Sequence, residues 1–429
     1  MTTAKHPRTA RSPLFILFIT VAIDLLGFGI ILPLLPLYVK QFGGSPVMAG
    51  WLTASYSVMQ FLFAPIWGRL SDLHGRRPLI LLSLVGSAIT FLLFGLATHL
   101  WILFAARIAA GITTAASLPT AQAYIADVTP PERRARGMAM IGVAFGIGFA
   151  IGPWIGGFLG RYSLALPALF VAGMAAVNFI WSFFALPESH LTDRDPGHAR
   201  KIVILDTARF AEVFRTPALS ELLSLFSFST FAFALMEATF TWLVLYNFVG
   251  PEHHIDVRNP HIAKPVLEFL QSSAAATVGP MFGIVGITAV VSQGAVMGGL
   301  AQRVGEVRLI WTGALILIGA LVGIALTHNI VVLTVLAALL AVGNGVMTPS
   351  VSSMISKAAD PRRKGGVLGV QQSLSSFTRI LAPPLGTWLL QRFSPAAPYV
   401  LSAVLMAIAF VLSLNLPKLP IGEATPTGV

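Results

Sequence analysis

Residues 68–80 read GRLSDLHGRRPLI, and this stretch decides how the rest of the chain is interpreted. It lies between two long apolar runs. Its charged residues are Arg69, Asp72, Arg76 and Arg77, and its framing glycines are Gly68 and Gly75. Only 10% of the 429 residues are charged, whereas a soluble globular protein is typically about a quarter charged. We therefore expect a chain that lies mainly in lipid and confines its charge to loops.

Twelve apolar runs follow one another along the chain. Each is near the roughly 20 residues that a helix needs to cross a hydrocarbon core about 30 Å thick. Only helices and closed barrels satisfy their backbone in lipid, and runs of this length are helices. The first run carries Asp24 and is too long for a signal peptide. The predicted spans are 14–36, 49–67, 78–97, 100–125, 138–159, 165–186, 219–248, 278–300, 307–326, 330–355, 367–390 and 396–416. The predicted fold is all-α, with twelve transmembrane helices.

Lysines and arginines are concentrated in the even-numbered loops and the two tails. The positive-inside rule therefore predicts that these loops, the 68–77 loop and both termini face the cytoplasm of a cell (inner) membrane. The net charge of +11 follows from these short loops, so we expect no nucleic-acid partner. The chain has no cysteine, which excludes disulfides and thiolate metal sites.

The chain also repeats itself at an offset of 230 residues. GRLSDLHGRRPLI at 68–80 aligns with GGLAQRVGEVRLI at 298–310, and GPWIGG at 152–157 aligns with APPLGT at 382–387. Parallel six-helix repeats with a site at their interface are one way in which secondary transporters are built. The predicted units are an N-terminal six-helix bundle (1–186), a cytosolic linker (187–218), a C-terminal six-helix bundle (219–416) and a cytosolic tail (417–429).

Two motifs resemble the major facilitator superfamily, in its twelve-helix drug:proton antiporter branch. Residues 68–77 fit Gly-x-Leu-x-Asp-x-x-Gly-Arg-Arg, and GFAIGPWIGG at 148–157 fits the fifth-helix signature Gly-x-x-x-Gly-Pro-x-x-Gly-Gly. IDLLGFGIILPLLP at 23–36 and SDLHGRRPLILLSL at 71–84 are most similar to tetracycline efflux proteins. The resemblance covers essentially the whole chain. It implies the major facilitator fold of two pseudo-symmetric six-helix bundles, and multidrug efflux that confers antibiotic resistance.

The resemblance implies that residues 68–77 form a cytosolic gate. Gly68 and Gly75 permit a tight turn. Asp72 is expected to face the start of the eleventh helix, near Gly365 and Gly366, where an anion is stabilised by about 0.3–1 kcal/mol.

Two arginines of this loop have two interpretations. Arg76 and Arg77 either surround Asp72 as ion-pair and lipid-phosphate donors, or only fix the topology. The second repeat has Gln302 where the first has Asp72, so we expect the gate contact in one half only.

A stripe of small residues marks the fifth helix. Glycines at four-residue spacing share one helix face and let helices pack closely, while a proline adds a bend. General helix packing is one interpretation. The resemblance implies in addition that the stripe seals the outer side against the eighth helix. The residues assigned to this seam are Gly148, Gly152, Pro153, Gly156 and Gly157, with Gly160 continuing the stripe.

Four ionisable residues lie inside predicted helices: Asp24, Arg107, Glu237 and Arg379. Each costs at least about 2.5–3.5 kcal/mol at a helix centre and faces a cavity or a partner. Static neutralising pairs are one interpretation. The other is a carboxylate that binds a proton and an arginine that tunes its pKa. The resemblance implies that helices 1, 4, 7 and 10 line the central cavity, and three of the four charges lie on these helices.

The tetracycline pumps have a helix 1 acid, a helix 4 arginine and a helix 8 glutamine, which match Asp24, Arg107 and Gln293. Their helix 8 histidine and helix 9 acid, associated with tetracycline–metal recognition and proton coupling, correspond to Ala289 and Leu317 here. These differences argue against tetracycline itself as the substrate. They favour Glu237 as the main proton carrier, with Asp24 as the alternative.

We therefore predict a proton-coupled antiporter that exports small, lipophilic, cationic or zwitterionic compounds by alternating access. A proton-coupled metabolite carrier, working as an importer, is the alternative, and a transport-inactive receptor is the third. We expect no enzyme, because the intramembrane charges include no nucleophile or metal cluster. We expect no cofactor, because the nucleotide-binding signature is absent and a proton gradient would supply the energy. The expected partners are the substrate, protons and lipid, and the expected state is a monomer.

The outer loop at 250–273 contains His253, His254 and His261. Their spacing fits no zinc pattern, so we expect a solvated loop and no metal site.

Overall fold

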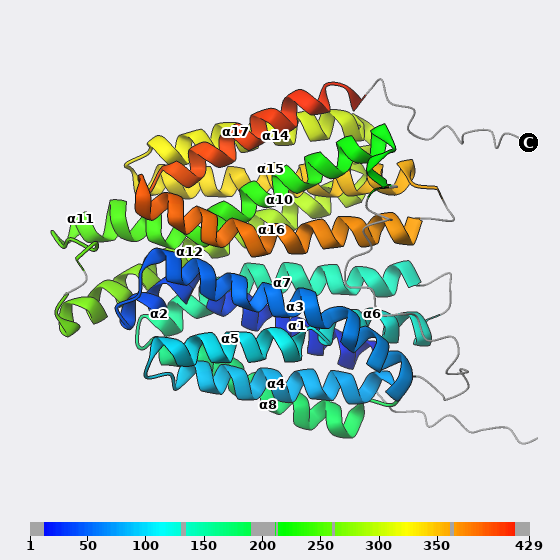
Figure 1. Cartoon of the computed structure of the whole chain (residues 1–429), viewed down its shortest axis with the longest axis horizontal. Coiled ribbons are helices and arrows are strands. Elements are labelled where there is room, and N and C mark those ends of the chain that lie inside the picture. Colours follow the sequence, from blue (N-terminus) through cyan, green and yellow to red (C-terminus); the bar gives the residue numbers. More distant parts are fainter. Residues whose placement is uncertain are drawn as a thin grey trace, which may run out of the picture.

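The structure is a computed structural model that describes residues 13–129, 134–189, 211, 213–259, 262–360 and 364–416. Within these ranges every regular element is a helix (Figure 1). The predicted linker and the predicted tail lie largely outside the described residues. The all-α prediction is thus confirmed for the part of the chain that can be described.

The helices follow the predicted apolar runs with one correction: α12 begins at Lys264 and not at 278, so much of the predicted outer loop at 250–273 is helical. The N-terminal half contains α1 (Pro13–Ile31), η1 (Leu32–Leu34), α2 (Leu35–Gln41), α3 (Pro46–His74), α4 (Arg76–Gly95), α5 (Leu100–Thr114), α6 (Ser117–Val128), α7 (Arg134–Gly160) and α8 (Ala165–Ala185). The C-terminal half contains α10 (Pro217–Val244), η4 (Leu245–Val249), α11 (Gly250–Glu252), α12 (Lys264–Ala295), η5 (Val296–Leu300), α13 (Ala301–Val304), α14 (Glu306–Leu326), α15 (Ile330–Ala358), α16 (Lys364–Arg392) and α17 (Ala397–Ser413).

Nine helices in the described ranges are long and apolar enough to cross a membrane, and Gly146–Gly160 and Ala397–Ser413 are shorter apolar helices. Several membrane spans are continuous rods made of two or three of these elements. For example, Leu14–Gln41 joins α1, η1 and α2. The chain is therefore an integral membrane protein, in agreement with the sequence.

Side-chain capping explains where two of the helices begin. The Ser45 hydroxyl accepts from the Met48 amide in the first turn of α3 at 3.4 Å, and Pro46 occupies the first position of that turn. Asn329 caps α15 in the same way, accepting from the Val331 amide at 2.9 Å. Such caps satisfy amide groups that the helix itself cannot pair.

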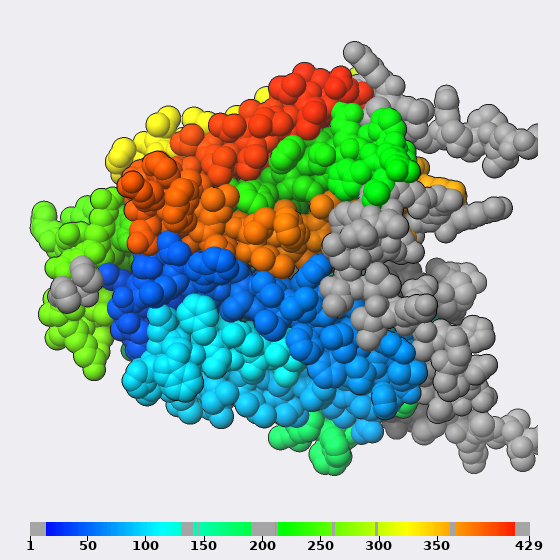
Figure 2. Space-filling view, in the orientation of Figure 1, coloured from blue at the N-terminus to red at the C-terminus, as the bar shows by residue number. Residues whose placement is uncertain are grey.

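The two halves meet tightly at one end of the rods. We call the end that carries the α3–α4 turn at Gly75 the basic end, and the other the opposite end. At the opposite end, a Cβ added to Gly157 of α7 would lie 2.5 Å from the Gly279 Cα of α12. A Cβ added to Gly50 of α3 would lie 2.6 Å from the carbonyl oxygen of Pro383 in α16. Figure 2 shows the blue surface of α3 against the orange surface of α16.

Polar contacts also join the halves at the opposite end. The Thr241 hydroxyl of α10 donates to the Pro33 carbonyl of η1 at 2.7 Å. The Gln271 amide of α12 donates to the Leu37 carbonyl of α2 at 3.1 Å. Both side chains are buried, so water does not compete for these bonds.

The helix faces are uncovered toward the basic end. An added Cβ would meet no atom within 4 Å at Gly68 of α3, Gly294 of α12 or Gly369 of α16. Two of these helices, α3 and α16, contact each other closely at the opposite end. In Figure 1 the ends of α3 and α16 also lie apart at the basic end, so the halves are closed at the opposite end and open at the basic end.

The glycine stripe of α7 packs against a different helix from the one predicted. Added Cβ atoms at Gly148, Gly152 and Gly156 would lie 2.5–2.9 Å from backbone atoms of α1, in the same half. The prediction that the seam faces the eighth helix, α12, is therefore wrong for these three glycines and confirmed for Gly157 and Gly160. Gly157 does face α12, because one residue further along a helix the side-chain direction turns by about 100°.

Pro153 and Gly160 complete the geometry of α7. The Pro153 carbonyl would lie 3.0 Å from a Cβ on Gly279 of α12, and a Cβ on Gly160 would meet Ala275 of α12 at 3.2 Å. The contact between the halves therefore uses a second face of α7, next to the glycine stripe.

These two faces predict different effects of substitution. Gly152→Leu inserts a side chain between α7 and α1, so it should lower the stability of the N-terminal half by about 1–3 kcal/mol. Gly157→Leu should leave that half stable but hold the opposite end apart. Thermal unfolding in detergent, and labelling of an engineered cysteine at the opposite end, measure the two effects. Equal labelling of both variants would contradict this assignment.

Candidate functional site

The structure places three of the four predicted intramembrane charges around one tyrosine, and the fourth, Glu237, beside one of the three. Asp24 is on α1, Arg107 on α5, Glu237 on α10 and Arg379 on α16. Tyr56 of α3 lies within electrostatic range of Asp24, Arg107 and Arg379. Arg379 is likewise within range of Glu237. Since both halves contribute, this group of residues forms a site between them.

Asp24 is held by two hydroxyl groups. The Ser87 hydroxyl of α4 donates to one carboxyl oxygen at 3.2 Å, and the Ser117 hydroxyl of α6 donates to the other. Hydrogen bonds of this kind stabilise a carboxylate in a poorly solvated place. Asp24 therefore joins three helices of the N-terminal half, and its direct partners are serines rather than Arg107.

Arg107 lies against the ring of Tyr56. Its guanidinium is 4.8 Å from the ring centroid, and the residue is 3% exposed. Its Nε and Nη2 atoms have no hydrogen-bond partner among the described residues. A cation over an aromatic face gains about 2 kcal/mol or more when desolvated. Tyr56 is therefore the main stabilising contact that the structure gives Arg107.

Tyr56 is itself fixed by polar and aromatic neighbours. Its hydroxyl pairs with the Thr114 hydroxyl at 3.0 Å and accepts from the Gln60 amide at 3.3 Å. The Phe28 ring of α1 lies 5.9 Å away, centroid to centroid. The Tyr56 ring is thus held by residues of α1, α3 and α5, beside the charged residues.

The two charges of the C-terminal half are less restrained. Arg379 is exposed although it lies in the middle of α16, and in the described part of the chain no carboxylate is within 4 Å of it. The Glu237 carboxylate forms no hydrogen bond with a described residue. A guanidinium at membrane depth faces water or a partner, so this side of the site is open.

Gln293, the third match to the tetracycline pumps, is exposed on α12. No hydrogen bond within the described ranges joins it to the four charges. The structure therefore brings Asp24, Arg107, Glu237 and Arg379 together and leaves Gln293 aside.

Sequence reasoning missed Tyr56, Ser87 and Ser117. Serine and threonine are common in membrane helices, and nothing in the spacing of these three residues marks them. A buried arginine needs a partner, and the aromatic residue nearest in the fold is a reasonable candidate. That residue becomes visible only after α3 and α5 are placed side by side.

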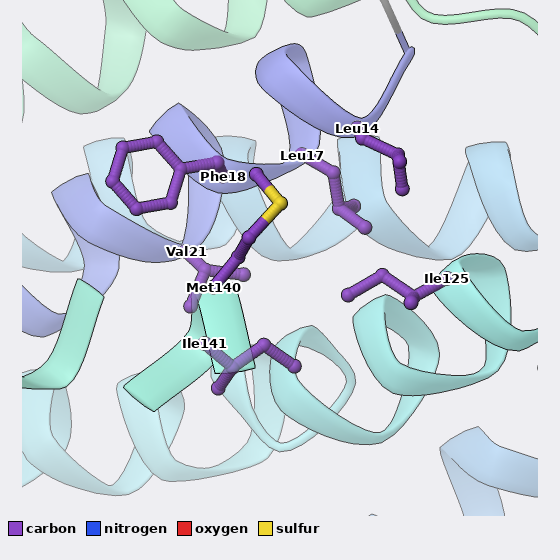
Figure 3. Close-up of a pocket in the computed structure, with 7 residues that line it drawn as sticks. All are labelled: Leu14, Leu17, Phe18, Val21, Ile125, Met140 and Ile141. Atoms are coloured by element: carbon purple, nitrogen blue, oxygen red, sulfur yellow. The ribbon is translucent and has the colours of Figure 1, made fainter. Parts of the chain in front are cut away.

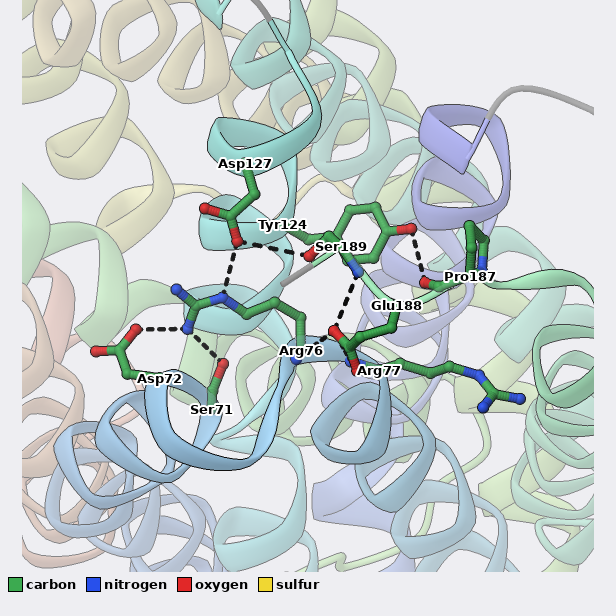
Figure 4. Close-up of polar contacts among 9 residues, drawn as sticks. All are labelled: Ser71, Asp72, Arg76, Arg77, Tyr124, Asp127, Pro187, Glu188 and Ser189. Carbon is green, nitrogen blue, oxygen red and sulfur yellow. Dashed lines mark hydrogen bonds and ion pairs between the residues drawn. The ribbon is translucent and has the colours of Figure 1, made fainter. Parts of the chain in front are cut away.

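A second polar cluster lies at the basic end, around Arg76 (Figure 4). Its guanidinium is 2.6 Å from an Asp72 oxygen and 3.1 Å from an Asp127 oxygen, and it donates to the Ser71 hydroxyl at 2.8 Å. The Arg76 residue is only 4% exposed. Arg76 therefore ties the end of α3 to the end of α6.

Glu188, just after α8, caps the N-terminus of α4. Its carboxylate accepts from the backbone amides of Arg76 at 2.9 Å and of Arg77 at 3.3 Å (Figure 4). An anion at a helix N-terminus satisfies free amides and the helix dipole together. The segment that leads into the predicted linker is thereby fixed to the α3–α4 turn.

The gate prediction is corrected in one respect, while the predicted ion pair between Arg76 and Asp72 is confirmed. Asp72 contacts Arg76 in its own half, rather than the start of the eleventh helix, α16. This agrees with an open basic end, where α3 and α16 diverge. Arg77 donates to the Phe183 carbonyl at 2.5 Å.

The cavities that the structure shows away from the charges are apolar. A gap of about 10 Å³ between α1, α6 and α7 is drawn in Figure 3, and its lining residues are Leu14, Leu17, Phe18, Val21, Ile125, Met140 and Ile141. A buried water needs polar partners, so this gap is a packing defect. A larger groove of about 520 Å³ lies between α3 and α5, beside Trp51 and Met59.

The structure gives no support for a metal site. The described residues contain no group of three or more possible metal ligands. His253 packs its ring edge against Phe269 at 4.8 Å, and His261 lies outside the described residues.

Comparisons with known proteins agree with this architecture. A profile of the family described as Major Facilitator Superfamily matches residues 17–326 and 261–428. The class E tetracycline resistance protein of Escherichia coli is 33% identical over 88% of this chain and 86% of its own. The human organic anion transporter MFSD10 is 26% identical, with a TM-score of 0.63 over 93% of this chain and 98% of its own.

A bacterial homologue of the lysosomal transporter Spinster, solved in an inward-facing and occupied conformation, shares the fold alone. It is 15% identical, with a TM-score of 0.72 over 95% of this chain and 96% of its own.

The turn at the basic end can be tested with a matched pair of glycines. Gly75 and Gly305 have φ of 94° and 90°, a region that costs other residues about 1–3 kcal/mol. A Cβ at Gly75 would also lie 2.6 Å from the Glu188 carboxylate, whereas at Gly305 it would meet nothing within 4 Å. Gly75→Ala should therefore lower the unfolding temperature in detergent more than Gly305→Ala. Equal losses would show that the Glu188 cap does not constrain the turn.

Proposed function

Because the chain belongs to the major facilitator superfamily, we propose that it is a proton-coupled antiporter that exports small lipophilic compounds by alternating access. One observation carries this proposal. The site contains charges from both halves, and those halves are closed at the opposite end and open at the basic end. Relatives named as tetracycline resistance proteins support export of drug-like molecules. The two differences from those pumps, at Ala289 and Leu317, argue against tetracycline itself.

Glu237 is the proposed proton carrier. Asp24 is already held by two serine hydroxyls, so it has a structural role in joining helices of one half. Glu237 lacks such bonds among the described residues and lies within range of Arg379, whose side chain is exposed. Movement of that guanidinium toward or away from Glu237 would change how readily the carboxyl releases its proton.

The proposed setting follows from the loop charges. The basic end faces the cytoplasm, both termini are cytoplasmic, and the protein acts as a monomer in the inner membrane. Its partners are protons, lipid and the transported molecule. The proton gradient is the proposed energy source, without a cofactor.

A second candidate function, carriage of organic anions, is favoured by one observation. Arg379 presents an exposed guanidinium to the site without a carboxylate within 4 Å in the described ranges. MFSD10 is described as an organic anion transporter. Rhodamine 123 and fluorescein share a xanthene ring but carry opposite charge. Their transport by proteoliposomes would separate the two candidates: uptake of the cation favours the first and uptake of the anion the second.

The proton carrier can be tested in proteoliposomes with an imposed pH gradient. Glu237→Gln mimics the protonated carboxyl, so it should abolish gradient-driven transport of the compound that the wild type carries and leave its binding measurable. Asp24→Asn should weaken binding and coupling together, because it alters the packing of three helices.

Glu268→Gln serves as the control, since Glu268 is an exposed carboxylate near the start of α12. It should transport normally. Uphill transport by Glu237→Gln would exclude Glu237 as the carrier and leave Asp24.

A further inference from the structure

The groove between α3 and α5 has the length of one lipid chain. Its wall on α3 runs from Met48, in the first turn of the helix at the opposite end, to Met59. That separation corresponds to a helical rise of about 16 Å, and one leaflet makes up about half of a hydrocarbon core about 30 Å thick. The groove therefore extends from the opposite end to about the middle of the membrane.

The walls of the groove suit an aliphatic occupant. Trp51 of α3 and Ile108 of α5 are 57% and 36% exposed, so both are open to lipid. Ser55 carries the only hydroxyl among the described lining residues, and it donates to the Leu52 carbonyl at 2.9 Å. A polar compound would thus find few partners here, whereas a hydrocarbon chain can fill the space that the side chains leave unpacked.

A cation of the other half lies near the mouth of the groove. The Gln391 side-chain oxygen of α16 accepts from the Val47 amide at 3.4 Å, which places the end of α16 beside the start of α3. The next residue, Arg392, is exposed, and no carboxylate in the described ranges lies within 4 Å of it. The nearby rings of Trp388 and Phe393 pack edge to face at 5.7 Å. Exposed aromatic residues of this kind mark the level of the lipid headgroups.

We propose that one phospholipid of the leaflet at the opposite end binds across α5, α3 and α16, with an acyl chain in the groove and its phosphate on Arg392. Figure 2 shows blue α3 between cyan α5 and orange α16 on one face of the molecule. A guanidinium binds phosphate oxygens through charge-assisted hydrogen bonds. The bound lipid contacts both halves where they are closed, and its site does not depend on which compound is transported.

The end of α7 provides a matched cation in the N-terminal half. Arg161 is also exposed, but its guanidinium lies over the rings of Phe158 and Tyr162, at 4.3 and 4.8 Å. It also donates to the Tyr162 hydroxyl at 2.7 Å. Because its own neighbours already engage it, we expect Arg161 to contribute little to lipid binding.

Native mass spectrometry of the full chain in detergent tests the site by counting the lipid molecules that stay bound. Titration with dioleoylphosphatidylglycerol should give one adduct at a lower concentration than any other. Dioleoylglycerol has the same chains without the phosphate, and glycerol 3-phosphate has the phosphate without the chains. Each should bind at least about ten-fold more weakly, because only the complete lipid engages the groove and Arg392 together.

Two variants remove one part of the site each. Arg392→Gln should raise the lipid concentration needed for the first adduct about five- to ten-fold, because it removes the charge, and Arg392→Lys should lose less. Val58→Trp fills the groove and should weaken the first adduct to a similar extent. Arg161→Gln and Val177→Trp, the latter at a 68% exposed position of α8, should bind like the wild type.

Wild-type binding by both Arg392→Gln and Val58→Trp would overturn the site. An equal loss in Arg161→Gln would show a general attraction of lipid to basic residues and would overturn it as well. Equally tight binding of dioleoylglycerol or of glycerol 3-phosphate would exclude recognition of a whole phospholipid. Size-exclusion chromatography and thermal unfolding confirm that each variant is folded.

Discussion

The two halves are held together at the opposite end by the close approach of backbones. Lipid removes most of the hydrophobic drive for helices to associate, so packing and a few hydrogen bonds must supply it. Gly157 against Gly279 and Gly50 against Pro383 supply that packing, because a side chain at either glycine would prevent it. Such a contact has no interlocking side chains to disentangle. It can be broken as a unit, which a protein that alternates between two open ends requires.

The two halves hold the charged residues of the site in different ways. The N-terminal half fixes Asp24 with two serines and Arg107 with the Tyr56 ring. The C-terminal half leaves Arg379 exposed and Glu237 without a hydrogen bond in the described part. A rigid set of charges therefore faces an adjustable one. Arg379 is within electrostatic range of Tyr56 in the other half and of Glu237 in its own half. Its guanidinium can therefore couple the charges of the two halves.

Much of the fold could be predicted from composition and repeats. Long apolar runs permit little besides helices in lipid, and the offset of 230 residues indicated a duplicated unit. Rotation of individual helices could not be predicted. A shift of one residue separates Gly156, which faces α1, from Gly157, which faces α12. The Arg76 partner of Asp72 was one of the predicted interpretations, whereas the expected contact of Asp72 with the start of α16 was not found.

Only the charged residues of the site could be predicted, because a charge inside an apolar helix is costly and therefore stands out. An ionisable residue inside an apolar run is conspicuous, so Asp24, Arg107, Glu237 and Arg379 could be found. Serine and tyrosine side chains are not costly in a membrane helix, so Ser87, Ser117 and Tyr56 left no signal.

The turns at Gly75 and Gly305 have almost the same backbone angles, although their surroundings differ. The duplicated unit thus kept its backbone geometry while its charges diverged. The same angles occur with a carboxylate beside the glycine, at Gly75, and without one, at Gly305, so the backbone angles of the turn do not require that neighbour.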